Sequence, residues 1–317
     1  MRYLFLILIS SLYLWANAHI FIYHRFEDPN RASTNTSLKE LKKEFEYFKN
    51  NGYKVVALSD IVKKIKDKQK VPDNWVALTI DDSYKSFYYK ALPLFKEYKY
   101  PFSLFVYTEA SNRSFGDFMS WRQIKEAAKY GEIGLHSFGH KKLPTLSDEQ
   151  IKVDTQKSME DFVNNLGFKP KGYAYPYGEY DDRVKNIVKS FGFDYILNQS
   201  TGSVNKNSDL HDLNRVALVG EVNLKQKLKY KTLPASWIEP KKYPKDKVLK
   251  KIKAKVDKSI KTVKVYVTGH GWIENVKVKN GIVDLNVNLK LKRSRIRVMI
   301  GTDYFTIATK MILKNSK

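Results

Sequence analysis

Two adjacent aspartates, Asp81 and Asp82, follow directly on the apolar run Trp75–Ile80. Two like charges side by side repel each other unless a cation or a hydrogen-bond donor compensates them. One carboxylate of such a pair can coordinate a metal ion while its neighbour faces the metal-bound water as a general base. An Asp-Asp pair alone is more often a turn or a helix cap. The pair therefore indicates chemistry only in combination with other residues.

Two histidines, His136 and His140, lie four residues apart after a second apolar run, Ile133–Leu135. A compact loop or one helical turn would place both imidazoles on one side, where they can chelate one ion. Adding one carboxylate gives a two-histidine, one-carboxylate site with open positions for water and substrate. These ligand types suit Zn²⁺, and Co²⁺, Ni²⁺ or Fe²⁺ also fit them. The spacing alone is often a coincidence.

Polar residues also follow two further strand-like runs. His24 comes directly after Ile20–Tyr23, and Tyr177 lies in a Pro-Tyr-Gly turn after Gly172–Tyr175. In a βα barrel the carboxyl ends of all strands meet at one face, where catalytic groups gather. Hydrolysis of an amide also needs a proton for its leaving nitrogen. We predict His24 as the general acid, because the pKa of histidine lies near neutral pH.

Two other histidines are rivals for the role of general acid. His211 lies in a polar loop, and His270 lies between two glycines near the end of the chain. The simpler interpretation of each is an ordinary surface histidine.

Short apolar runs alternate with amphipathic helical stretches from His19 to about Leu218. The runs that we predict as strands are Ile20–Tyr23, Val55–Leu58, Val76–Ile80, Phe102–Val106, Ile133–Leu135, Tyr173–Tyr175, Tyr195–Leu197 and Val216–Val219. Repeated βα units with buried strands predict an α/β fold with a parallel sheet, either open or closed into a barrel, of about seven units.

The pattern changes near the C-terminus, where strand-like alternation replaces the βα units. Asn280-Gly281 is a hairpin signal within this region, and the region predicts a small antiparallel β domain. We expect four parts: a signal peptide at 1–18, a barrel at 19–236, a lysine-rich linker with a helix at 237–261, and an all-β domain at 262–317.

The N-terminus has the features of a signal peptide. Arg2 supplies a positive charge, Leu4–Trp15 is an apolar run, and Ala16-Asn17-Ala18 is a small-x-small cleavage site. The run is short for a membrane-spanning helix. We therefore expect a secreted or periplasmic protein, with membrane association only if the segment is not cleaved.

Composition narrows the chemistry and the partners. The 317 residues include no cysteine, so disulfides and thiolate ligands are excluded and a metal must be bound by His, Asp or Glu. The formal net charge is +24, which often indicates nucleic-acid binding. Export and the lack of a nucleic-acid motif argue against that partner. An anionic envelope polymer is a better candidate, and a plain solvated lysine surface explains the charge equally well.

Three motifs, in this order, resemble those of the NodB-like polysaccharide deacetylases. They are Thr79-Ile80-Asp81-Asp82-Ser83, His136-Ser137-Phe138-Gly139-His140 and Tyr173-Ala174-Tyr175-Pro176-Tyr177-Gly178. The resemblance covers roughly residues 20–220 and implies a distorted (β/α) barrel that removes N-acetyl groups from a polysaccharide. It implies a divalent metal held by Asp82, His136 and His140. It also implies Asp81 as the catalytic base and the backbone N–H of Tyr177 as an oxyanion donor.

Within that family, two stretches resemble the exopolysaccharide deacetylases that act on poly-β-1,6-N-acetylglucosamine. They are Tyr23-His24-Arg25 and Ala174–Tyr180. In that subgroup an N-terminal histidine supplies the acid function, which supports His24. Ser83 replaces a usual glycine, which reduces backbone freedom. Ala174 stands where chitin and peptidoglycan deacetylases usually carry an arginine that braces the catalytic aspartate, and Arg215 is our candidate to replace it.

Two other functions remain open beside a metal-dependent deacetylase of an N-acetylated polysaccharide such as poly-N-acetylglucosamine or peptidoglycan. The first is a non-catalytic glycan-binding protein on a deacetylase scaffold, which the β tail and the basic charge would suit. The second is a hydrolase of another non-peptide C–N bond on the same barrel. Intact metal and base positions favour the deacetylase.

Overall fold

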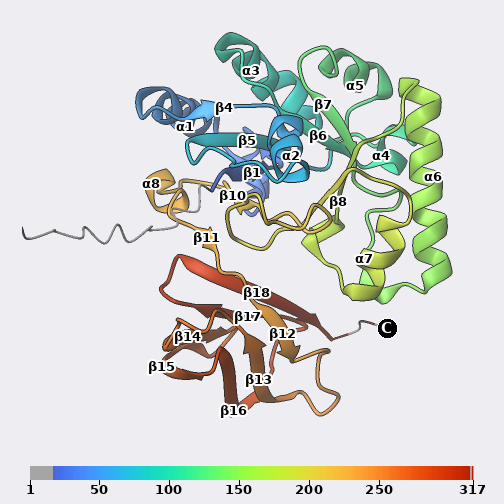
Figure 1. Cartoon of the computed structure of the whole chain (residues 1–317). Helices are drawn as coiled ribbons and strands as arrows, with labels where there is room; N and C mark the ends of the chain where they lie inside the picture. Colours follow the sequence, from blue (N-terminus) through green and yellow to red (C-terminus); the bar gives the residue numbers. More distant parts are fainter. Residues whose placement is uncertain (1–16, 315, 317) are drawn as a thin grey trace, which may run out of the picture.

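The computed structural model describes residues 17–314 and 316, and it has two parts (Figure 1). A parallel sheet with helices around it forms the first part, and an antiparallel β domain lies beneath it in the view of Figure 1. The predicted signal peptide, residues 1–18, lies almost entirely outside the described residues. Among the helices that are described, none has the length and apolar character needed to span a membrane.

The parallel sheet follows the order β10-β1-β5-β6-β7-β8-β9, with β4 paired to β5. Its strands are β1 (His19–Tyr23), β4 (Lys54–Val55), β5 (Trp75–Ile80), β6 (Ser103–Val106), β7 (Glu132–Leu135), β8 (Gly172–Ala174), β9 (Tyr195–Leu197) and β10 (Val216–Ala217). The ends of this path, β9 and β10, form no ladder with each other, so the barrel is incompletely closed. This arrangement confirms the predicted distorted (β/α) barrel of about seven strands.

Helices cover the outside of this sheet (Figure 1). They are α1 (Leu38–Asn50), α2 (Leu58–Lys66), α3 (Leu92–Tyr98), α4 (Thr108–Asn112), α5 (Trp121–Ala127), α6 (Asp148–Leu166), α7 (Asp182–Lys189) and α8 (Leu224–Lys227), with a π-helical turn at Phe87–Ala91 before α3. The short strands β2 (Arg25–Phe26) and β3 (Asn35–Thr36) pair with each other.

Local sequence sets the bounds of the longest helix, α6. The Ser147 hydroxyl accepts a hydrogen bond from the backbone N–H of Gln150, whose side chain in turn bonds to the backbone of Ser147. This capping box satisfies two donors that the first helical turn leaves free. Gly167 ends the helix with φ 81°, a left-handed conformation that glycine adopts without steric cost.

Aromatic side chains fill the space between the helices and the sheet. The rings of Phe45, Phe87, Phe95 and Phe102 meet edge to face, with centroids 4.9–5.7 Å apart, and all four side chains are buried. Edge-to-face pairs of this kind contribute about 0.5–1.5 kcal/mol each beyond the burial of area. The apolar stripe of α1 thus fixes the position of that helix against the sheet.

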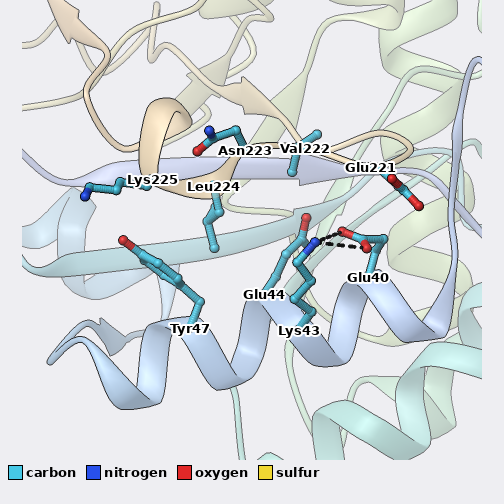
Figure 2. Close-up of a pocket in the computed structure, with 9 residues that line it drawn as sticks. All are labelled: Glu40, Lys43, Glu44, Tyr47, Glu221, Val222, Asn223, Leu224 and Lys225. Carbon is cyan, nitrogen blue, oxygen red and sulfur yellow. Dashed lines mark hydrogen bonds and ion pairs between the residues drawn. The ribbon is translucent and has the colours of Figure 1, made fainter.

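A pocket of about 500 Å³ opens between α1 and the segment that carries α8, and it holds a buried carboxyl group (Figure 2). Glu44 is 2% exposed and accepts a 2.7 Å hydrogen bond from the Tyr23 hydroxyl. Its second oxygen, Oε1, has no hydrogen-bond partner among the described residues. Burial raises the pKa of Glu44 from 4.5 to about 8. Glu44 is therefore protonated and neutral at pH 7.

Replacing Glu44 with glutamine is expected to make the protein more stable than the wild type above pH 8. A carboxyl whose pKa is raised by folding stabilises the native state fully below pH 4.5 and loses that contribution as the pH rises through 8. The wild-type free energy of unfolding should therefore fall by a few kcal/mol more than that of the variant over this range. Urea unfolding at several pH values measures the difference.

The matched control for Glu44 is Glu221→Gln, because Glu221 lines the same pocket and is exposed. This variant should follow the wild-type pH dependence. Parallel curves for Glu44→Gln and the wild type would contradict the prediction.

Eight strands in the order β11-β18-β17-β14-β15-β16-β13-β12 form the second part. They are β11 (Lys231–Thr232), β12 (Ser236–Glu239), β13 (Val248–Lys255), β14 (Thr262–Val267), β15 (Gly271–Lys279), β16 (Ile282–Lys290), β17 (Arg295–Gly301) and β18 (Thr306–Leu313). The predicted hairpin turn joins β15 to β16, and both Asn280 and Gly281 have positive φ, as a type I′ turn requires. The predicted antiparallel C-terminal domain is confirmed.

The helical linker predicted at residues 237–261 is wrong, because β12 and β13 occupy much of this segment. In β13 the buried Ile252 and Ala254 alternate with lysines, which is the period of a strand and not of a helix. Lys251 and Lys253 both form ion pairs with Asp284 on the neighbouring β16. Pairing between strands outweighs the helix propensity of lysine here. The β sheet also begins earlier than predicted, with β11.

Candidate active site

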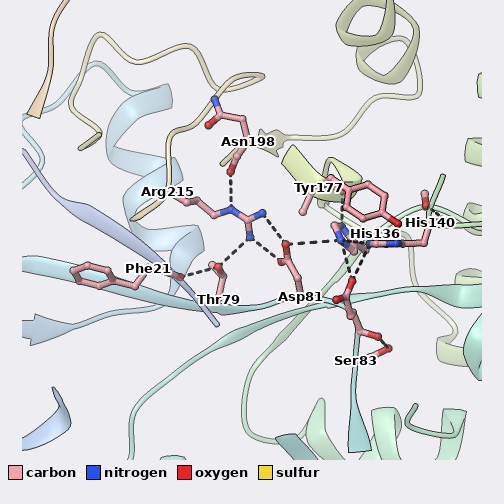
Figure 3. Close-up of polar contacts among 12 residues, drawn as sticks. Phe21, Thr79, Asp81, Ser83, His136, His140, Tyr177, Asn198 and Arg215 are labelled. Atoms are coloured by element: carbon pink, nitrogen blue, oxygen red, sulfur yellow. Dashed lines mark hydrogen bonds and ion pairs between the residues drawn. The ribbon is translucent and has the colours of Figure 1, made fainter. Parts of the chain in front are cut away.

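The site residues predicted from the sequence lie at one end of the barrel, and the side chain of Arg215 extends to this end from the start of β10. Asp81 and Asp82 follow β5 and His136 follows β7, and all three are at most 5% exposed. Figure 3 shows polar contacts that join Arg215, Asp81, His136 and His140, with Tyr177 beside His140. The loops after three parallel strands thus supply the cluster, as expected for a barrel.

Three ligand atoms converge at this cluster. Oδ1 of Asp82 lies 3.0 Å from Nε2 of His140 and 3.3 Å from Nε2 of His136. The two Nε2 atoms are 3.2 Å apart. Asp82, His136 and His140 are a group whose ligand atoms all lie within 4.8 Å of one another among the described residues.

The chemistry of these atoms fits a divalent cation. Nδ1 of His136 lies 2.7 Å from the carbonyl oxygen of Ala174, so it carries the proton and donates this hydrogen bond, which leaves a lone pair on Nε2. Oδ1 of Asp82 is buried and has no hydrogen-bond partner among the described residues. Lone pairs so close together repel each other unless a positive charge lies between them. Two imidazoles and a carboxylate with remaining open positions suit Zn²⁺ and related ions.

The backbone around the cluster is unusual, because non-glycine residues there adopt the left-handed conformation. Asp82 has φ 71°, Ser83 φ 57°, Ser137 φ 67°, His140 φ 46° and Tyr177 φ 60°. Each such residue costs about 1 kcal/mol or more, and such residues gather at functional sites. Ser83, at the position where the family usually has glycine, adopts the conformation that glycine would favour.

Asp154 on α6 supports the histidine loop and was not predicted from the sequence. Its two carboxylate oxygens accept hydrogen bonds of 3.0 and 2.8 Å from the backbone N–H groups of Phe138 and Gly139. Burial outweighs these donors and raises the pKa of Asp154. The only signal in the sequence is that Asp154 falls on the apolar side of the predicted helix. No pattern links it to the loop that carries Phe138 and Gly139.

Arg215 and Asp81 form a fully buried ion pair (Figure 3). Nη1 and Nη2 of Arg215 donate to Oδ1 and Oδ2 of Asp81 over 2.7 and 2.8 Å. Arg215 also donates to the carbonyl of Asn198 and the hydroxyl of Thr79. Burial alone would raise the pKa of Asp81, but the charge of Arg215 outweighs it and holds the pKa below its ordinary value. Asp81 is therefore an ionised carboxylate.

Replacing Arg215 with methionine is expected to destabilise the protein by about 3–5 kcal/mol, because Asp81 would remain as an unpaired buried charge. The double variant Arg215→Met/Asp81→Asn should lose clearly less than the sum of the single variants. Denaturant unfolding measures all three. The control is Arg113→Met, which breaks the pair of the exposed Arg113 with the half-buried Glu109 and should cost about 1 kcal/mol. Additive losses at Arg215 and Asp81 would contradict the coupling.

His24 lies deep in the same end of the barrel, although solvent still reaches part of the residue. Burial lowers the pKa of its imidazole, whereas the charges of Asp82 and Asp81 raise it. Nδ1 of His24 is buried without a hydrogen-bond partner among the described residues. His24 is thus close enough to both aspartates for their charges to change the pKa of its imidazole.

Tyr177 connects the cluster to the β domain. Its ring lies 4.6 Å from the His140 ring, and its carbonyl oxygen accepts a 3.0 Å hydrogen bond from Nη2 of Arg295 on β17. Nη1 of Arg295 lies 3.6 Å from the buried Glu179 carboxylate. No sequence pattern indicates that the second part of the chain contacts this loop.

The rival histidines lie elsewhere. His211 pairs locally with Asp209, 3.7 Å away, and His270 is exposed in the β domain, where its Nε2 lies 3.0 Å from the carbonyl of Lys290. Neither belongs to the group of converging ligand atoms.

A parallel barrel whose strand ends bring together two histidines and two aspartates is typical of metal-dependent hydrolases. Residues 68–196 match the sequence profile of the polysaccharide deacetylase family. This match agrees with the family that the three sequence motifs resemble.

Relatives and solved structures agree with this assignment. The chain is 24% identical over 228 residues to the poly-β-1,6-N-acetyl-D-glucosamine N-deacetylase of Escherichia coli K12, covering 59% of this chain and 34% of that protein. It therefore spans about a third of the length of that relative. IcaB from Ammonifex degensii is 25% identical, with a TM-score of 0.59 over 64% of this chain and 92% of that one.

The deacetylase PplD of Streptococcus pyogenes, solved in complex with acetate, has the same fold. Its identity to this chain is 20%, and the TM-score is 0.62 over 68% of this chain and 99% of that one.

Proposed function

We propose that this protein is a metal-dependent N-deacetylase of an N-acetylated polysaccharide. The observation that carries the proposal is the convergence of Asp82, His136 and His140 beside the buried, ionised Asp81. A site of this kind can hold a cation, activate water and accept a proton within a few ångströms. The family of residues 68–196 supports an amide of an acetylated sugar as the reacting group.

Each side chain has a proposed task in amide hydrolysis. Asp81 accepts a proton from the attacking water, because its oxygens retain lone pairs that Arg215 does not use. The backbone N–H of Tyr177 donates to the carbonyl oxygen as that oxygen gains negative charge. His24 delivers a proton to the leaving nitrogen, so that the products are acetate and a free amine.

Asp82, His136 and His140 would hold a divalent cation, and we propose Zn²⁺, with Co²⁺, Ni²⁺ or Fe²⁺ as alternatives. When bound there, the cation would lower the pKa of a coordinated water and polarise the acetyl carbonyl. Arg215 keeps Asp81 ionised and oriented. Chitin and peptidoglycan deacetylases usually have an arginine for this role at the position of Ala174.

For the polymer, the named relatives favour a glucosamine-based exopolysaccharide over a small amide. The E. coli relative is named for poly-β-1,6-N-acetyl-D-glucosamine, and we extend that substrate to this chain only as a proposal. The N-terminal sequence supports action outside the cytoplasm, in the periplasm or beyond it.

Acetate release tests the proposal. The mature protein, with its metal content determined on the same sample, should release acetate from at least one of three polymers: β-1,6-linked N-acetylglucosamine, chitin oligomers and peptidoglycan. A chelator should stop the release, and adding back Zn²⁺ should restore it. Absence of acetate from all three polymers with metal-loaded protein would refute the proposed function.

A further inference from the structure

A cleft of about 570 Å³ lies between the barrel and the β domain. Ile22 on β1, Ala217 on β10 and Arg215 just before β10 line one side, and the opposite wall comes from β14, β15, β17 and β18. Ala217 is exposed although it belongs to a barrel strand. The incomplete closure of the barrel beside β10 therefore leaves solvent access to this cleft.

Aromatic rings form one wall of the cleft. Trp272 lies between Tyr266 and Tyr304, with ring centroids 5.4 and 5.3 Å away. Tyr304 is 49% exposed, and Trp272 and Tyr266 are half-buried. A row of partly exposed rings offers apolar area and polar edges at low cost in side-chain entropy, which suits the flat faces of sugar rings.

The charged groups of the cleft are all positive. Arg293 and Arg297 are exposed side chains that line it, and none of the described aspartates or glutamates does. No ion pair joins either guanidinium to a carboxylate within the described part of the chain, whereas Arg215 is neutralised by Asp81. Guanidinium groups bind carboxylates with paired hydrogen bonds, so the cleft is complementary to an acidic ligand.

The cleft adjoins the candidate active site at Arg215. Arg215 lines the cleft and bonds to Asp81. On β17, Arg295 donates to the carbonyl of Tyr177, and Arg297 lies two residues further on the same face, about 7 Å along the strand. A polymer with its reacting sugar at Asp81 can thus extend along β17 into the cleft.

We propose that this cleft binds a stretch of polysaccharide that carries carboxylates, next to the sugar that is deacetylated. The polymer then contains acidic units beside its N-acetylglucosamine. Sugar rings stack on Trp272 and Tyr266, and the carboxylates pair with Arg293 and Arg297. The identity of the reacting sugar rests on the proposed function. Binding of the polysaccharide in the cleft does not require that the sugar is deacetylated. Deacetylated units carry ammonium groups, which the arginines repel, so the cleft favours acidic or still acetylated stretches.

Two non-reactive hexasaccharides test the cleft without involving deacetylation. One is a β-1,4-linked glucuronate hexamer, and the other is the matching neutral glucose hexamer; neither has an N-acetyl group. Calorimetric titration of the purified full-length protein should show at least tenfold tighter binding of the glucuronate hexamer. Arg293→Ala/Arg297→Ala should weaken it by about tenfold or more, since hydrogen bonds to charged groups contribute strongly.

The control is Lys277→Ala/Lys279→Ala, which removes the same charge from exposed positions on β15 outside the cleft. This pair should leave the affinity within about twofold of the wild type. Trp272→Phe, a conservative change, should weaken both hexamers. Equal losses in the arginine and lysine pairs, or no preference for the acidic hexamer, would overturn the proposal. Binding as expected without acetate release from any polymer would refute the proposed function and leave the cleft intact.

Discussion

Asp81→Asn is expected to lower kcat for acetate release by about 10²–10⁴-fold, the range typical for loss of a general base. The amide cannot accept a proton from water, although it fills the same volume. The three ligand residues are unchanged, so metal content should remain at the wild-type level. Initial rates of acetate release, with metal content measured on the same sample, check both expectations.

The buried ion pair complicates this test, because Asp81→Asn also leaves the guanidinium of Arg215 without its carboxylate partner. The double variant Asp81→Asn/Arg215→Met removes both charges and should recover stability but not activity. Restored turnover in the double variant would mean that Asp81 acts through structure alone. Turnover of Asp81→Asn within tenfold of the wild type would exclude it as the base.

Replacing a predicted metal ligand is expected to have the second large effect on activity. His136→Ala should reduce bound metal from about one ion per chain to near zero and abolish measurable acetate release, because only one imidazole and one carboxylate remain. Elemental analysis after dialysis measures the metal, independently of any substrate.

His211→Ala and His270→Ala are the matched controls, since both histidines lie outside the converging group. They should keep metal content and turnover near wild-type values. Metal retention by His136→Ala, or metal loss from His270→Ala, would place the metal elsewhere in the protein.

The alternation of apolar and helical segments was sufficient to predict the barrel, because buried parallel strands leave a strong signal. β5 and β7 are continuous apolar runs followed at once by polar residues, so their ends could be assigned before the fold was known. The close approach of Asp82, His136 and His140 follows from this topology. Their roles in catalysis stay predictions.

Contacts between residues far apart in the sequence could not be predicted from sequence patterns. Asp154 binds backbone N–H groups, which no side-chain motif reveals. Arg295 reaches the carbonyl of Tyr177 across 118 residues. The helix predicted over β13 is wrong because its lysines favour a solvated helix, whereas the buried Ile252 and Ala254 follow the two-residue period of a strand.

The hydrogen bond from Arg295 to Tyr177 also has a consequence for the order in which the protein is made. At about 5–20 residues per second, synthesis of the 118 residues from Gly178 to Arg295 takes about 6–24 seconds. A barrel that folds during this interval lacks its contact with Arg295. The loop beside His140 receives this support only after β17 has been translated and has paired with its neighbours. Nascent chains released before residue 295 would thus carry all the predicted catalytic residues but an unsupported loop.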